Sequence, residues 1–82
     1  MKILIILVLS ITFLLSAVDI NNADELELIT LKGIGSQKAK AIINYRHTHC
    51  FKTIESLTDV KGIGVKTLEK NRMNLEVGKC KK

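Results

Sequence analysis

The sequence predicts an all-α domain of four to five short helices that follows an N-terminal signal peptide. Three observations lead to this prediction: an apolar stretch at the N-terminus, a glycine motif that occurs twice, and apolar residues at helical spacing around both copies. The chain has 82 residues and no proline. It is therefore long enough for one small domain, and no proline removes a backbone N–H donor from a helix.

The N-terminal stretch has the features of a secretory signal peptide. Lys2 is followed by an almost unbroken apolar run over residues 3–15, and the small residue Ala17 comes shortly after it. A basic residue, a short apolar core and a small residue at the exit are typical of a cleaved leader. We therefore expect a signal peptide over residues 1–17 and an exported, periplasmic domain over residues 18–82. The alternative is an uncleaved leader that anchors the domain to the cytoplasmic membrane, although a spanning helix needs about 20 residues.

Charge is distributed unevenly along the rest of the chain. Residues 18–31 contain four acids and no bases, whereas residues 32–82 contain twelve bases and four acids, a net charge of 12 − 4 = +8. A basic field of this kind favours a polyanion as partner, either a nucleic acid or an anionic membrane surface. Residues 18–82 show no long cationic amphipathic helix. We therefore expect membrane contact only through the leader, if it is not cleaved.

Cys50 and Cys80 both lie outside the leader. An even number of cysteines in an exported protein suggests a disulfide, which here would close a loop of about 30 residues and stabilise the domain by about 3–4 kcal/mol. The sequence does not establish that the two thiols meet. A zinc site would need about four ligands and would have to combine both cysteines with His47 and His49. We expect the disulfide instead, with no metal and no other cofactor.

A short motif occurs twice in the chain. Leu31-Lys32-Gly33-Ile34-Gly35 returns 29 residues later as Val60-Lys61-Gly62-Ile63-Gly64, and Leu28 maps onto Leu57 at the same offset. An internal repeat of this kind indicates a duplicated structural unit.

Helical patterns flank the first copy. Asn22, with Glu25 three residues later, is close to a capping box and predicts the start of a first helix that ends just before Gly33. Lys38 and Lys40 are expected on the polar side of a second helix. Its inward face would carry Ala39, Ala41, Ile42, Ile43 and Arg46.

The second copy is flanked in the same way. We expect a break over residues 47–52, followed by a short helix that Thr53 caps. The last helix should start near Val65, with Leu68 and either Arg72 or Met73 facing inward.

A Gly-Ile-Gly turn between two helices suits a phosphate group. Glycine tolerates positive φ and lets the backbone approach a ligand closely. The N–H groups at the start of the following helix have no partner inside it and carry the positive end of the helix dipole. The alternative is a sharp turn without a ligand. The candidate DNA-binding residues are Lys32, Gly33, Ile34, Gly35, Lys38, Lys40, Lys61, Gly62, Ile63, Gly64 and Lys66. Of these, Ile34 and Ile63 should point into the core.

These residues resemble the helix-hairpin-helix family, and in particular its ComEA-type competence proteins. The likeness extends over Val18-Asp19-Ile20-Asn21-Asn22-Ala23, the first hairpin with its helices up to Tyr45-Arg46, and the second hairpin from Phe51 to Leu68-Glu69-Lys70. The chain departs from the family at His47-Thr48-His49-Cys50, where a glycine turn is usual, and at Asn71-Arg72-Met73, where an aliphatic residue is usual.

The resemblance implies a tandem helix-hairpin-helix domain that binds double-stranded DNA through its phosphate backbone. Such binding is independent of sequence and sensitive to salt. The implied role is that of a DNA receptor or ratchet outside the cytoplasm, in DNA uptake for natural transformation, with other uptake proteins as further partners.

No set of catalytic residues is apparent. Metal-dependent nuclease chemistry needs clustered carboxylates, but the basic part of the chain has only Glu55, Asp59, Glu69 and Glu76, scattered among lysines. We therefore expect no enzyme and no small-molecule substrate. The alternative function is an exported structural or protein-interaction subunit of the same fold that does not bind DNA. The lysines at both hairpins favour DNA.

Overall fold

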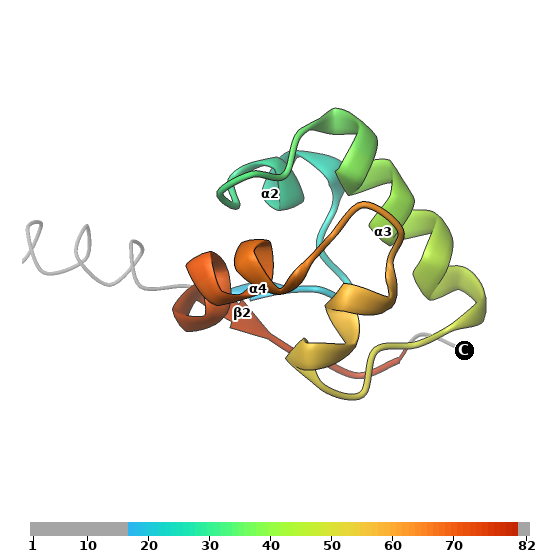
Figure 1. The fold of residues 1–82 in the computed structure, drawn as a ribbon. Helices are drawn as coiled ribbons and strands as arrows, with labels where there is room; N and C mark the ends of the chain where they lie inside the picture. The colour runs from blue at the N-terminus through green and yellow to red at the C-terminus, as the bar shows by residue number, and fades with distance from the viewer. Residues whose placement is uncertain (1–16, 81–82) are drawn as a thin grey trace, which may run out of the picture.

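The computed structural model describes residues 17–80 and confirms the mostly helical, tandem helix-hairpin-helix architecture (Figure 1). The predicted signal peptide lies outside the described residues, apart from Ala17. Among the helices of residues 17–80, none is both long and apolar enough to cross a membrane. The elements, in order, are β1 (Val18–Asp19), α2 (Glu25–Ile29), α3 (Ser36–Thr48), the 3₁₀-helix η1 (Ile54–Asp59), α4 (Val65–Asn71), the 3₁₀-helix η2 (Arg72–Asn74) and β2 (Leu75–Glu76).

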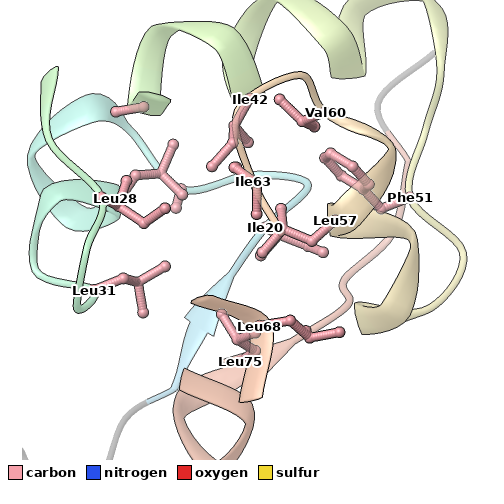
Figure 2. Close-up of a cluster of buried hydrophobic side chains, with 13 residues drawn as sticks. Ile20, Leu28, Leu31, Ile42, Phe51, Leu57, Val60, Ile63, Leu68 and Leu75 are labelled. Atoms are coloured by element: carbon pink, nitrogen blue, oxygen red, sulfur yellow. The ribbon is translucent and has the colours of Figure 1, made fainter. Parts of the chain in front are cut away.

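The hydrophobic core lies between the two copies of the repeat. In Figure 1, α2 lies in the upper part of the molecule, α3 runs from the top down the right side, and η1 and α4 form the lower part. Figure 2 shows Ile20 near the centre of the cluster, with side chains from both copies around it. Four pairs of buried hydrophobic residues are related by the repeat offset of 29: Leu28 and Leu57, Leu31 and Val60, Ile34 and Ile63, and Ala39 and Leu68. The inward direction predicted for the two central isoleucines is therefore confirmed.

The first helix begins two residues later than predicted from Asn22. Asp24 is the N-cap, and its carboxylate accepts the Glu27 N–H at 2.9 Å while Glu27 Oε1 accepts the Asp24 N–H at 3.2 Å. This reciprocal pair is a capping box. Asn22 instead donates from Nδ2 to the Asp19 carboxylate at 2.7 Å and to the Lys79 carbonyl at 3.1 Å. The Asn22 side chain thus joins the two ends of the domain.

The later helix boundaries confirm some predictions and correct others. Helix α3 continues through Thr48, so the predicted break starts at His49. Thr53 caps η1 as predicted, because its hydroxyl accepts the Ser56 N–H at 3.3 Å. The inward position proposed for Met73 is wrong: its side chain is 93% exposed, because the helix ends in the 3₁₀ turn of η2. Leu75, two residues on, is buried in its place.

Two parallel strands bring the ends of the domain together. Val18 of β1 lies opposite Leu75 of β2, and Asp19 lies opposite Glu76. Each strand has only two residues, which is too short for a sequence pattern to reveal. The predicted disulfide between Cys50 and Cys80 is also confirmed, with 5.7 Å between the two Cα atoms. It ties the segment after α3 to the segment after β2.

Asp19 is a second tie between these ends. Its Oδ1 atom accepts the N–H groups of Asn21 and Gly78, both at 2.9 Å. Burial acts to raise the pKa of the Asp19 carboxyl, but the hydrogen bonds from Asn22, Gly78 and Asn21 together lower it below its ordinary value of 3.8. The ionised carboxylate is therefore the form that the folded protein favours.

This lowered pKa predicts a pH-dependent contribution to stability. A carboxyl with a lower pKa in the folded state stabilises the fold above its ordinary pKa, and the contribution is lost as pH falls through the folded value. Asp19→Asn should therefore lose less unfolding free energy than the wild type between about pH 5 and pH 2. Urea unfolding at several pH values measures this difference. Glu76→Gln on β2 is the matched control, and the same acid dependence in Asp19→Asn as in the wild type would contradict the assignment.

Candidate nucleic-acid interface

The two glycine hairpins have the same backbone geometry. The first glycine of each, Gly33 and Gly62, has a positive φ of 78° and 94°, respectively. Only glycine adopts this region without steric cost. The second glycine of each, Gly35 and Gly64, is extended and is the N-cap of the following helix, α3 or α4. The prediction that these glycines make tight inter-helix turns is confirmed.

Both following helices begin without a side-chain cap. The first backbone bonds after the glycine caps run from the Ala39 N–H to the Gly35 carbonyl at 2.9 Å and from the Leu68 N–H to the Gly64 carbonyl at 3.1 Å. The N–H groups before these bonds have no acceptor inside their own helix. They carry the positive end of the helix dipole, which favours an anion. The N–H groups without an acceptor in their own helix belong to Ser36, Gln37 and Lys38 in α3 and to Val65, Lys66 and Thr67 in α4.

The two hairpins pack against each other's helices. A Cβ atom on Gly33 would lie 3.8 Å from the Thr67 side chain of α4, and a Cβ atom on Gly62 would lie 3.9 Å from Cε of Lys38 on α3. These are ordinary van der Waals distances. Each glycine turn therefore faces the first turn of the helix that follows the other hairpin, and both turns lie on one side of the domain.

Lys38 has a position that the sequence did not predict. Its Nζ atom donates to the Gly33 carbonyl at 3.5 Å, while its Cε atom lies beside Gly62. The ammonium group is thus placed between the two hairpins. The sequence predicted only that Lys38 lies on the polar side of the helix after the first hairpin.

Asn71 fixes the first hairpin to α4 from within. This side chain is 2% exposed. Its Oδ1 atom accepts the Lys32 N–H at 2.8 Å, and its Nδ2 atom donates to the carbonyls of Lys32 at 2.8 Å and Thr67 at 2.9 Å. The sequence showed Asn71 only as a departure from an aliphatic pattern. The available signal was the repeat offset, which aligns it with Ile42, also buried. A polar residue at a core position needs hydrogen-bond partners, and the hairpin backbone provides them.

Comparison with known proteins establishes the family. A helix-hairpin-helix motif matches residues 15–76. The chain belongs to the helix-hairpin-helix family. ComE operon protein 1 of Bacillus subtilis (strain 168) is 46% identical over 61 residues, which cover 73% of this chain and 30% of that protein. This similarity agrees with the resemblance to ComEA-type proteins.

Two further proteins are similar to this chain. An uncharacterized protein of Haemophilus influenzae is 50% identical over 56 residues, which cover 66% of this chain and 50% of the relative. Endonuclease/exonuclease/phosphatase family domain-containing protein 1 of Xenopus laevis is 40% identical over 58 residues, which cover 70% of this chain and 10% of the relative. The chain thus spans half or less of the length of each of these relatives.

Among residues 17–80, no lysine forms an ion pair with a carboxylate. Within residues 17–80, both ion pairs belong to Arg72, which contacts Glu55 and Glu69, each at 2.6 Å. The hydrogen bonds from Arg72 lower the pKa of both carboxyls. Of the lysines proposed to contact DNA, Lys38 is half-buried. The other four are exposed: Lys32, Lys40, Lys61 and Lys66. Their positive charge is therefore available to a ligand.

Tyr45 and His49 pack against each other. The half-buried Tyr45 ring stacks on Phe51 and His49, with ring centroids 5.4 Å and 4.6 Å apart. A groove of about 390 Å³ lies between α3 and the start of the second hairpin and is lined in part by Tyr45, His49 and Lys61. In the described part of the chain, no group of three or more His, Cys, Asp or Glu is placed to hold a metal ion.

Proposed function

We propose that this protein binds double-stranded DNA without sequence preference and serves as a DNA receptor or ratchet during DNA uptake for natural transformation. The observation that carries the proposal is the placement of two glycine hairpins side by side, with the Lys38 ammonium between them. Membership of the helix-hairpin-helix family and the similarity to ComE operon protein 1 support DNA binding.

The geometry suits two phosphate groups of a DNA backbone. Each hairpin offers backbone N–H donors and a helix dipole of the right sign. Lys38 can neutralise charge at both hairpins, and the exposed Lys66 adds charge in the first turn of α4. These groups contact phosphates and carry no information about base identity. Binding is therefore expected to be independent of sequence.

Salt dependence tests this function. Neutralising about 4–6 phosphates predicts a slope of about −4 to −5 in a plot of log affinity against log salt concentration. Fluorescence titrations of two labelled duplexes of unrelated sequence, at several salt concentrations, measure both the slope and the sequence preference. A slope near zero would rule out phosphate neutralisation as the basis of binding. A strong preference for one duplex would show that the protein reads bases.

We also propose that the protein works outside the cytoplasm. The Cys50–Cys80 disulfide supports this location, because such bonds persist in oxidising compartments and are rare in the cytosol. The composition of residues 1–17 supports it as well, since it is typical of a secretory leader. N-terminal sequencing of the protein purified from its host should give Val18 as the first residue. Recovery of Met1 or Lys2 would show that the leader is retained.

A further inference from the structure

The first hairpin carries a carboxylate next to its anion-binding end. The Ser36 hydroxyl donates to Oε2 of Glu25 at 3.0 Å. Ser36 is the first residue of the 13-residue helix α3, and its N–H group is among those that precede the first bond of that helix. Glu25 is the first residue of α2. A negative side chain from one helix is thus placed at the positive end of the next.

The second copy of the repeat has no counterpart to this pair. At the offset of 29, Glu25 corresponds to Ile54 and Ser36 corresponds to Val65. The second hairpin nevertheless has the same glycine geometry and the same extended N-cap as the first. The Glu25–Ser36 bond is therefore not required to form a hairpin of this type.

The start of α2 does not depend on Glu25 either. The capping box of this helix is made by Asp24 and Glu27, which satisfy each other's backbone N–H groups. To the start of α2 the half-buried Glu25 contributes only a charge in the first turn of a short helix, an interaction that is typically weak. Neither the hairpin nor the cap thus accounts for a carboxylate at this position.

We propose that Glu25 is an internal competitor of DNA at the first hairpin. This inference rests on the proposed function and adds the residue that limits affinity. In the free protein, the Glu25 carboxylate accepts a hydrogen bond from the Ser36 hydroxyl in the first turn of α3, the end of the helix where the dipole and the unpaired N–H groups attract an anion. A DNA phosphate at this hairpin has to displace Glu25 or bind beside it against electrostatic repulsion. The first hairpin therefore binds DNA less tightly than its backbone geometry allows.

Glu25→Gln removes the charge and keeps a side chain of the same shape that can still hydrogen-bond to Ser36. At low salt, one unit charge about 4 Å from a phosphate changes affinity about 5-fold, so the full-length variant should bind duplex DNA about 5-fold more tightly than the wild type. Glu76→Gln is the matched control, because it makes the same change in net charge at an exposed position on β2.

The two variants separate the possible results. Tighter binding by Glu25→Gln, with Glu76→Gln close to the wild type, supports the competitor role. Equal affinity of Glu25→Gln and the wild type, or the same gain in both variants, overturns it while leaving the proposed function intact. Failure of all three proteins to bind DNA would overturn both proposals. Binding by Glu25→Gln alone would support the competitor role in its strongest form.

A second measurement needs no DNA. Inorganic phosphate can be titrated into ¹⁵N-labelled protein while the backbone amide signals of Ser36, Gln37 and Lys38 are followed by NMR. In Glu25→Gln these signals should move at a phosphate concentration about 5-fold lower than in the wild type and Glu76→Gln. The same response in all three proteins would show that the Glu25 carboxylate does not occupy the anion position.

Discussion

Replacing both Lys38 and Lys66 with glutamate is expected to weaken the binding of duplex DNA by at least about 100-fold at low salt. Lys38 lies between the two hairpins, and Lys66 lies in the first turn of α4. The double substitution therefore reverses the charge at both candidate phosphate positions. The fold should survive, because Lys66 is exposed and the only hydrogen bond of the Lys38 side chain within residues 17–80 is an exposed one. Titration of a labelled duplex measures the loss, and circular dichroism checks the fold.

A matched double variant shows whether position or total charge matters. Lys52→Glu with Lys79→Glu makes the same change in net charge at exposed sites outside the hairpins and their helices. It should weaken binding much less than the hairpin variant. Equal losses in the two variants would mean that DNA responds only to the overall field of the protein. Wild-type affinity in the hairpin variant would exclude the hairpins as the site.

Loss of the disulfide is expected to have the largest effect on stability. Closing the loop between Cys50 and Cys80 stabilises the fold by about 3–4 kcal/mol through the entropy of the unfolded chain. A domain of this size buries a small core, and its total stability is of the order of 5 kcal/mol. The variant with serine at both positions should therefore unfold at a much lower urea concentration, and it should be partly unfolded at 37 °C.

Reductant provides the control for this prediction. Dithiothreitol should lower the urea midpoint of the wild type towards that of the serine variant and leave the serine variant unchanged. The dependence of unfolding free energy on urea should be measured in each case, because a changed slope would indicate a changed unfolded state. A wild-type midpoint that is insensitive to reduction would contradict the expected contribution of the bond.

The repeat explains why much of the fold could be predicted. Residues 28, 31 and 34 and their partners 29 positions on form matching buried sets, so the two hairpins and their inward isoleucines follow from the pattern alone. The start of the first helix could not be predicted as well, because two nearby residues are both suited to be its N-cap. Both Asn22 and Asp24 can cap a helix, and the choice between them depends on the Asp19 carboxylate and the Lys79 carbonyl, which bind Asn22.

The candidate site was predictable residue by residue but not as an arrangement. The glycines and lysines could be selected from their types and spacing. The place of the Lys38 side chain beside Gly62 and the bonds of Asn71 to Lys32 depend on how the two copies of the repeat pack against each other. Such contacts join residues far apart in the chain, and a single sequence carries no local signal for them. The Glu25–Ser36 bond was not predicted either, because it depends on how α2 and α3 pack across the first hairpin.

The crossed packing of the hairpins also bears on how such a domain can arise. Gly33 faces Thr67, and Gly62 faces Lys38. The repeat offset of 29 relates Gly33 to Gly62 and Lys38 to Thr67, so each contact joins the same two repeat positions, one from each copy. Contacts related in this way are isologous, as in a dimer with a two-fold axis. Two separate chains with one copy each could make the same pair of contacts. Gene duplication and fusion of a self-complementary ancestor would give one chain with a pseudo-two-fold axis, in which equivalent positions can carry different residues, as Lys38 and Thr67 do.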